Sequence, residues 1–473
     1  MRKRIPKKWL VVISVLLGAF TMILNNSMMN PALPYFRKIF DADEVSVSWV
    51  LTIFMVAMGM AMPLTGYFSE KIGKKNLFIM GLSVFITGSL LGSLSWDLGS
   101  IIFFRAVQGA AGGVMIPLAM ALIFEVFPKY ERGKAMGVYG IAAMVAPAIG
   151  PTLGGLIVDH FHWRWLFLAN VPTGLLGLVM SVRYLEKPAR NPDKKFDLLG
   201  FITVTLGVGS ILLAFNRMQD LDQLTNPFNL FVAAFGLVCL ALFVNVSKRK
   251  DDPLLELSLF RVAPFALSVW ISTVGTIGLF TSIFLLPFLI QSVYGYSALV
   301  TGLVLIPSAA LTGVFMNIGG RILDRKGPKA VVPFGLAITT IMMFMFFFVT
   351  VDTSLWVIVV LMALRGIGMG FTNMPSNTTG LNAVSDEFIT QGSTINNVVR
   401  RMGSALGVVF ISIYFQLRKM TLMDAGETRK IAEMSAINEA YLIIGIVTLL
   451  TIPAGIYIGI TFNRQQRQER ENQ

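Results

Sequence analysis

Apolar runs separated by short polar breaks follow one another along the whole chain. Cutting the sequence at charged or turn-rich breaks gives about fourteen runs that can each cross a bilayer, which takes roughly 20 helical residues. Since backbone polar groups in lipid must be satisfied within the chain, the runs predict an all-α membrane protein. We expect the spans at 9–35, 47–65, 77–95, 99–126, 135–157, 165–186, 198–216, 228–246, 264–289, 298–318, 330–350, 354–382, 391–416 and 438–462.

Composition excludes an ordinary soluble protein. Hydrophobic residues make up 55% of the chain and charged residues 14%, whereas roughly a quarter of the residues of soluble proteins are charged. Cys239 is the only cysteine, and both histidines, His160 and His162, lie in one short loop. An internal disulfide is therefore impossible, and we expect neither a metal nor a cofactor.

The formal charge of +13 comes from short basic clusters between the apolar runs. A nucleic-acid site would instead gather such residues on one domain, so we expect no nucleic-acid partner. Lys and Arg are retained on the cytoplasmic side of a membrane. The clusters predict a multi-pass protein of the bacterial cytoplasmic membrane with both termini inside, and an even number of spans agrees. The first run is too long for a signal peptide, so we expect it to be retained.

An internal repeat relates the two ends of the chain. The loop Gly66-x-x-x-Glu70-Lys71-x-Gly73-x-Lys75 returns as Gly320-x-x-x-Asp324-Arg325-x-Gly327-x-Lys329. A second pair follows in order, Arg105-Ala-Val-Gln-Gly109 and Arg365-Gly-Ile-Gly368. We expect six-span halves at 1–187 and 263–473, joined by a linker at 188–262 that carries two further spans. Such halves around a midplane cavity are typical of secondary transporters. The sequence has no P-loop for ATP.

Further motifs give this pattern a family resemblance. Span 5 contains Ala146-Pro-Ala-Ile-Gly150-Pro151-x-x-Gly154-Gly155, span 6 begins with Trp163-Arg-Trp-Leu-Phe-Leu-Ala-Asn170-Val-Pro172, and span 12 ends with Asn377-Thr-Thr-Gly380-x-Asn382. Taken in order with the loops above, the set resembles the major facilitator superfamily, in particular its fourteen-span drug:proton antiporter branch and a lincomycin-resistance-like subgroup. The resemblance implies two six-helix bundles plus two inserted helices, and export of drugs.

Two motifs predict moving parts. The repeated loops place paired charges, Glu70 with Lys71 and Asp324 with Arg325, where helices must slide past each other, which predicts a conformational latch; the alternative is a solvated turn. The latch residues are Gly66, Glu70, Lys71, Gly73, Asp324 and Arg325. In span 5, glycines offer a flat surface and prolines permit a bend; the alternative is a packing seam without gating. These antiporter-motif residues are Pro147, Gly150, Pro151, Gly154 and Gly155.

Ionisable residues inside a span are functional candidates, because lipid penalises their charge. Arginines occur deep in spans 4, 12 and 13, but no carboxylate lies deep in spans 1, 10, 12 or 13. Members of the family often carry an acid in span 1, where this chain has amides. The cavity should therefore favour neutral, zwitterionic or anionic amphiphiles; the alternative is interhelical hydrogen bonding without a ligand. The candidate substrate-cavity residues are Asn25, Asn26, Asn30, Arg105, Asn373, Asn377, Asn397 and Arg400.

Without a deep acid, the candidates for proton coupling lie near the span ends. Asp159 and His160 stand at the outer mouth and Glu125 at the inner end of span 4. Histidine titrates near neutral pH, so the outer pair could relay protons; an ordinary wetted loop is the alternative.

The leading hypothesis is a proton-coupled exporter of amphiphilic drugs that works as a monomer with protons and membrane lipids as partners. A flippase for lipids or lipid precursors, or an exporter of anionic or zwitterionic amphiphiles, is the alternative. A sensor is disfavoured because no long soluble domain exists. An enzyme is not expected, since the chain has no paired carboxylates, metal cluster or nucleophile and base pair.

Overall fold

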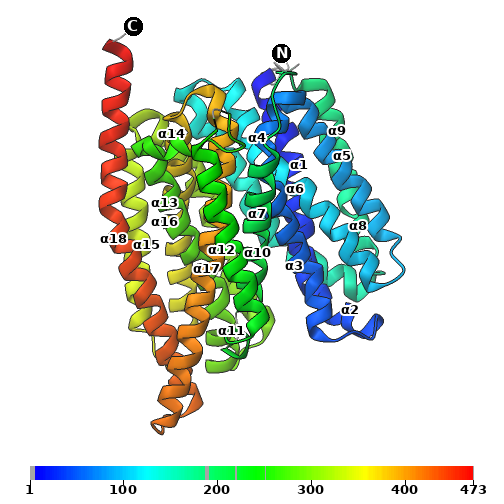
Figure 1. Ribbon diagram of the computed structural model, residues 1–473. Helices are drawn as coiled ribbons and strands as arrows, with labels where there is room; N and C mark the ends of the chain where they lie inside the picture. The colour runs from blue at the N-terminus through cyan, green and yellow to red at the C-terminus, as the bar shows by residue number, and fades with distance from the viewer. Residues whose placement is uncertain (1–5, 187–190, 219–220, 251, 472–473) are drawn as a thin grey trace, which may run out of the picture.

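The computed structural model describes residues 6–186, 191–218, 221–250 and 252–471, and every regular element in these ranges is a helix (Figure 1). The α-helices are α1 Lys7–Met29, α2 Leu33–Ile39, α3 Glu44–Ala61, α4 Leu64–Phe68, α5 Lys74–Ser93, α6 Leu98–Val126, α7 Arg132–His160, α8 Trp165–Leu168, α9 Asn170–Tyr184, α10 Leu198–Arg217, α11 Leu221–Leu224, α12 Pro227–Lys248, α13 Ala263–Pro287, α14 Ala298–Lys326, α15 Pro328–Phe347, α16 Leu355–Asn382, α17 Ile389–Asp424 and α18 Arg429–Glu471.

The predicted spans all correspond to helices. In the described ranges, 13 helical segments are long and apolar enough to cross a membrane, and the shorter apolar helix Ser46–Ala61 accounts for the second predicted span. The fourteen-span, all-α prediction is therefore confirmed. α1 begins and α18 ends at the same end of the bundle, here called the termini end, and the opposite end is called the far end (Figure 1).

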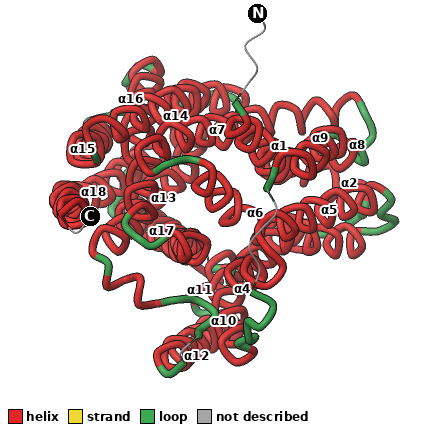
Figure 2. Tube along the Cα trace, turned by 90° about the horizontal axis from the view of Figure 1, so that it is seen from above, coloured by secondary structure: helices red, strands yellow, loops and turns green. Residues whose placement is uncertain are grey.

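The same packing scheme occurs twice. In the first half, α3 and α5 pack on α6, and α9 packs on α1 and α5. In the second half, α14 and α15 pack on α16, and α18 packs on α13 and α15. The two groups lie side by side when seen from above (Figure 2). Of the predicted domain boundaries, 187/188 lies outside the described residues, and 262/263, just before α13, remains a prediction.

The repeated loops share a backbone turn. Gly73 has φ 88° and Gly327 has φ 75°, and each directly precedes a helix, α5 or α15. Any residue that has a Cβ is strained at such a positive φ, whereas glycine is not. The glycine in both copies of the motif is thus explained by the turn that it forms.

The inserted helices α10 and α12 pack on each other at one side of the bundle (Figure 2). α10 also contacts both halves, because it packs on α3 and on α17. Thr52 Oγ1 of α3 donates a hydrogen bond to Asn216 Oδ1 of α10 at 2.7 Å. On the other side of α10, Met218, which follows the helix, shares a buried cluster with Val409 of α17.

The buried core is continuous between the halves only in part of the molecule. One cluster joins residues of α6 and α7, such as Met120 and Tyr139, with Met316 of α14 and Met374 of α16. Toward the far end, by contrast, the cluster around Trp163 belongs to the first half alone, and the cluster around Tyr441 belongs to the second half alone.

Candidate functional site

Helices α7 and α14 meet backbone to backbone near the termini end. A Cβ added to Gly320 would lie 2.0 Å from the carbonyl oxygen of Gly133, and a Cβ on Gly133 would lie 2.4 Å from that of Gly320. One turn along, a Cβ on Gly137 would lie 2.7 Å from the Cα of Asn317. Only hydrogen fits at this crossing, so the three glycines set how closely the halves approach.

Asp324 caps the first turn of α7 across this crossing. Its Oδ1 accepts a hydrogen bond from the Gly133 N–H and its Oδ2 accepts one from the Lys134 N–H, both at 2.8 Å. A carboxylate is stabilised at a helix N-terminus, where backbone N–H groups are unpaired and the helix dipole is positive. The sequence suggested a charge pair of Asp324 with Arg325; the described contacts of this carboxylate instead join the two halves.

Glu70, the equivalent acid of the first repeat, also reaches beyond its own loop. Its carboxylate pairs with Lys194 Nζ of the linker at 2.9 Å and accepts a hydrogen bond from Gln391 Nε2 of α17 at 3.0 Å. Lys71, which the sequence suggested as its partner, donates to the Tyr67 hydroxyl at 2.7 Å. Gly66 faces the same contact, because a Cβ there would lie 3.1 Å from Gln391 Cγ.

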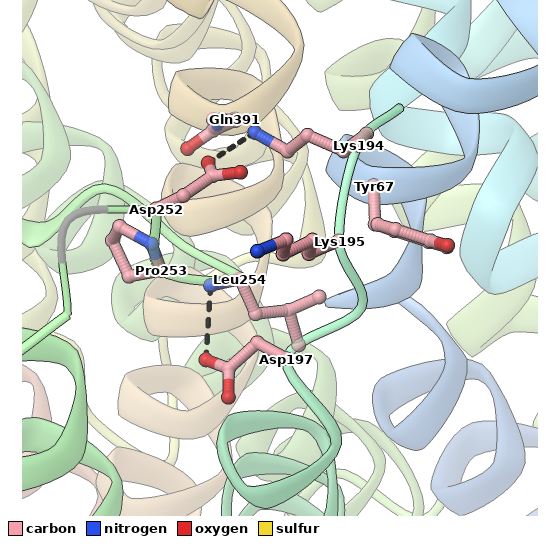
Figure 3. Close-up of a pocket in the computed structure, with 8 residues that line it drawn as sticks. All are labelled: Tyr67, Lys194, Lys195, Asp197, Asp252, Pro253, Leu254 and Gln391. Carbon is pink, nitrogen blue, oxygen red and sulfur yellow. Dashed lines mark hydrogen bonds and ion pairs between the residues drawn. The ribbon is translucent and has the colours of Figure 1, made fainter. Parts of the chain in front are cut away.

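The linker segments on both sides of the inserted helices are tied to this contact (Figure 3). Lys194 pairs with Asp252, and Lys250 pairs with Asp197. Asp197 also accepts from the Leu254 N–H at 3.2 Å. We call Glu70, Lys194, Asp197, Asp252 and Gln391 the linker cluster.

Two members of the linker cluster, Lys194 and Asp197, are held in their charged forms. Burial lowers the pKa of the Lys194 ammonium, but hydrogen bonds to Asp252 and Glu70 outweigh burial and raise the pKa above its usual value. Burial raises the pKa of the Asp197 carboxyl, but hydrogen bonds from Lys250 and from backbone N–H groups outweigh burial and leave the pKa below its usual value. A hydrogen-bonded charge is stabilised relative to its neutral form.

A hollow of about 440 Å³ lies beside the linker cluster. Its lining residues are Ser69, Glu70, Lys74, Glu125, Lys194, Asp252, Pro253, Glu256, Glu387, Phe388, Thr390 and Gln391. Glu125, a predicted proton-coupling residue, is exposed here and lies 3.7 Å from Lys74 Nζ.

Arg132, the first residue of α7, makes a further bond between the halves. Its Nη1 donates to Asn382 Oδ1 at 3.1 Å, and its Nη2 pairs with Asp386 at 3.0 Å. In the sequence this arginine is one of several basic residues between two spans. Asn382 and Asp386 are more than two hundred positions away, so spacing alone could not identify the contact.

Three of the predicted substrate-cavity residues, Asn25, Asn26 and Arg105, meet in the structure, and the arginine is fully enclosed. Its guanidinium donates to Asn25 Oδ1 at 2.6 Å, to Asn26 Oδ1 at 2.9 Å and to the Val50 carbonyl at 3.0 Å. The ring of Phe54 lies 4.1 Å from its Cζ. Arg105 and Asn25 are both 0% exposed. The arginine thus joins α1, α3 and α6, and only Asn26 of this trio is partly accessible.

A second polar layer links α16 and α17. Asn396 donates to Asn377, whose Nδ2 lies 3.2 Å from Met120 Sδ of α6. Asn397 accepts from Arg400 Nη2 at 2.8 Å. From the predicted set, the structure therefore places Asn397 against Arg400 and places Asn377 against Asn396, which is outside the set.

The remaining predicted cavity residues differ in exposure. Asn373 of α16 is half-buried, and its Oδ1 has no hydrogen-bond partner among the described residues. Asn30, at the far end of α1, is exposed. Whether any member of the predicted set touches a substrate remains a prediction.

The glycine motif of α7 packs against α1. A Cβ on Gly154 would lie 2.2 Å from the Met28 carbonyl oxygen, and one on Gly150 would lie 2.4 Å from Ser27 Cβ. A Cβ on Gly155 would meet nothing within 4 Å. The helix continues through Pro147 and Pro151, both of which are exposed, and Ser27 Oγ donates to the Pro147 carbonyl at 3.2 Å.

Asp159 and His160 lie on the surface at the far end of α7. Nδ1 of His160 is 3.3 Å from the Leu156 carbonyl oxygen one turn earlier. The three predicted proton-coupling residues are thus split between the two ends of the bundle, with Glu125 at the termini end.

Comparison with known proteins places this geometry among membrane transporters. The family profile described as Major Facilitator Superfamily matches residues 15–408. The chain is 31% identical over 405 residues to the lincomycin resistance protein LmrB of Bacillus subtilis, which covers 85% of each chain. It is 26% identical over 404 residues to the multidrug export protein EmrB of Escherichia coli, which covers 84% of this chain and 78% of the relative.

A solved structure shares the fold. The crystal structure of the human organic anion transporter MFSD10 (TETRAN) superposes with a TM-score of 0.66 at 15% identity, over 94% of this chain and 100% of the other. At this identity the likeness concerns the fold alone.

Proposed function

Because the chain belongs to the Major Facilitator Superfamily, we propose that it is a secondary transporter that exports amphiphilic small molecules by alternating access. Its similarity to proteins named for lincomycin resistance and multidrug export supports an amphiphilic drug as substrate. Such substrates need a permissive apolar wall with few fixed polar groups.

The observation that carries this proposal is the uneven contact between the halves. Near the termini end they share a buried core, the α7/α14 glycine crossing, the Asp324 cap and the linker cluster. Toward the far end the buried clusters belong to one half each. Two packed bodies joined at one end can rock about that contact, which is how such repeats alternate access.

In this proposal the contacts that join the halves near the termini end form a gate. The orientation of the protein in the membrane determines which side of the membrane this gate faces. Basic residues between the spans favour a cytoplasmic location for both termini. The closed end then faces the cytoplasm, and the described conformation is the one that releases substrate outward. Of the predicted latch residues, Gly66, Glu70 and Asp324 hold that state closed, together with Arg132.

Proton movement into the cell drives export in this proposal. Asp159 and His160 take protons at the outer mouth, and Glu125 releases them at the termini end. Their exposure at opposite ends of the bundle supports this division of roles. The neutral amides Asn25 and Asn26, which cannot titrate, leave the centre of the first half without a proton carrier.

Transport by purified protein in liposomes with an imposed pH gradient tests the proposal. We expect a fluorescent amphiphilic dye to move against its gradient, and a protonophore to abolish that movement. Asp159→Asn should reduce the driven rate while dye exchange without a gradient persists. Unchanged driven transport in the presence of protonophore would refute proton coupling.

A second candidate is a flippase for anionic or zwitterionic lipids. It is favoured by the deep arginines, for which the described residues offer no carboxylate partner. Translocation of a fluorescent-headgroup lipid across the liposome bilayer, in the absence of dye transport, would support this candidate over drug export.

A further inference from the structure

Four arginines lie within the membrane-spanning helices without an acidic partner among the described residues. They are Arg105, Arg365, Arg400 and Arg401. The hydrogen bonds described for Arg105, Arg365 and Arg400 go to side-chain amides, a serine hydroxyl and a backbone carbonyl, all of which are neutral. A charge in a low-dielectric interior is costly unless it is paired. The interior of this protein thus has a positive charge that the described part of the chain does not neutralise.

Two of these arginines are enclosed and cannot meet a ligand in this state. Arg105 is 0% exposed and is surrounded by amides. Arg365 is 4% exposed and donates twice to Ser308 Oγ, at 3.1 and 3.0 Å. They contribute to the positive potential but are not in a position to contact a substrate.

Arg400 and Arg401 are different, because both side chains are partly accessible and they follow each other on α17. Arg400 has one described hydrogen bond, to Asn397, and Arg401 Nε is buried without a partner among the described residues. The like charges of Arg400 and Arg401 act on each other, so an anion bound by both would offset their repulsion and supply an acceptor for the unpaired donor.

The other groups described near Arg400 are polar and neutral. The Tyr139 hydroxyl of α7 lies within electrostatic range of Arg400. Asn397, one turn before the pair, already accepts a hydrogen bond from Arg400 Nη2. Guanidinium groups bind planar carboxylate or phosphate oxygens in pairs, and the Tyr139 hydroxyl can donate to a further oxygen of such a group.

We propose that Arg400 and Arg401 form the recognition site for an anionic headgroup, a carboxylate or a phosphate, on the amphiphile that this protein transports. The inference rests on the proposed export function and narrows its substrate class to anions. The headgroup can belong to a free amphiphile or to a membrane lipid, since the chemistry that recognises it is the same.

Binding of matched probes tests the site. Purified full-length protein in nanodiscs of neutral phosphatidylcholine is titrated with dodecyl phosphate, dodecanoate, dodecanol and dodecyltrimethylammonium, which share one tail. We expect the two anionic probes to bind more tightly than the alcohol and the cation. Arg400→Gln and Arg401→Gln should each weaken the anionic probes roughly tenfold or more and leave dodecanol within about twofold.

Three comparisons make the result specific. Arg400→Lys retains the positive charge but loses the paired N–H donors of the guanidinium group. It should therefore bind dodecyl phosphate more tightly than Arg400→Gln does, but less tightly than the wild type. Arg183→Gln removes an exposed arginine of α9 and should leave all probes unchanged. The elution volume of each variant on gel filtration reports whether it is folded, and the lysine variant tests the site if a glutamine variant does not fold.

The outcomes separate the two proposals. Equal loss of anionic and neutral probes, or no loss in either glutamine variant, overturns the anion site even if dye export continues. If neither amphiphile binding nor dye export is found, the export function itself fails. Nanodiscs with phosphatidylglycerol distinguish the source: competition with dodecyl phosphate by this lipid supports a lipid headgroup, and its absence supports a free amphiphile.

Discussion

The backbone of Gly133 lies directly against the backbone of Gly320, and each residue would place an added Cβ within 2.4 Å of the other's carbonyl oxygen. Among the described glycines, these two would place a Cβ closest to the other half. It lies beside the Asp324 cap, whose two hydrogen bonds hold the first turn of α7 against α14.

Gly320→Val should therefore force the gate apart. Overpacking of this kind destabilises a packed contact by about 1–3 kcal/mol, which shifts the balance between closed and open gate roughly fivefold to more than a hundredfold. The distance between spin labels attached at positions 134 and 321 measures the shift. The matched control is Gly302→Val on the same helix, where a Cβ meets nothing within 4 Å. An equal distance change in both variants would contradict the role of the glycine crossing.

Two neighbouring glycines of the α7 motif should respond differently to the same substitution. Gly154→Ala pushes a methyl group into the Met28 carbonyl of α1, whereas Gly155→Ala enters open space. We expect the first variant to lose about 1–3 kcal/mol of stability and to unfold several degrees lower, and the second to match the wild type. Thermal unfolding in detergent, followed by tryptophan fluorescence, measures the difference. Similar melting temperatures would indicate that α1 and α7 readily move apart.

Arg105 should be a stability residue more than a substrate residue. Arg105→Met removes donors from Asn25, Asn26 and the Val50 carbonyl, and unpaired buried acceptors cost about 1–3 kcal/mol each. Arg105→Lys should not restore stability. The guanidinium group donates to partners on two helices through separate N–H groups, and a single ammonium group cannot reach both. Urea unfolding monitored by circular dichroism checks this, with Arg183→Met as the exposed control. A fully stable Arg105→Met protein would return this arginine to the list of substrate contacts.

The linker cluster should hold the gate equally well across the neutral pH range. The pKa of Lys194 is raised in the folded protein, so its contribution is fully present below the usual 10.5 and is lost only as pH rises through the higher folded value. The pKa of Asp197 is lowered, so its contribution is present above the usual 3.8 and is lost as pH falls through the lower folded value.

Lys194→Gln should accordingly change the export rate by the same factor at about pH 6 and about pH 8. The factor should be modest, up to about fivefold, since partly exposed ion pairs contribute up to about 1 kcal/mol. Lys195→Gln removes a neighbouring exposed lysine and serves as the control. A factor that differs strongly between the two pH values would show that another titrating group acts through this cluster.

The number of spans and the repeat could be predicted from the sequence because both depend on local patterns. Apolar length defines a span, and the left-handed turns at Gly73 and Gly327 require glycine at the same place in each repeat. Span ends were harder to predict. α17 continues to Asp424, beyond the predicted end at 416, because charged side chains there are paired with the next helix, as Arg418 is with Glu439 at 2.8 Å.

The contacts that join the halves near the termini end could not be predicted from spacing. Glu70 meets Gln391, and Arg132 meets Asp386, across hundreds of residues. The sequence identified Glu70 and Asp324 as equivalent acids, but adjacent basic residues suggested local partners for both. In the structure, a helix N-terminus and a linker lysine provide more favourable partners, because they satisfy backbone donors and a partly buried charge at once.

The position of α10 has a mechanical consequence. This helix is packed against α3 on one side and α17 on the other, and it is hydrogen-bonded to the first half through Asn216. A single rigid rod cannot stay fixed to two bodies that tilt relative to each other. In any rocking motion one of its two interfaces must slip, and the apolar cluster that Met218 shares with Val409 offers less resistance than the hydrogen bond between Thr52 and Asn216.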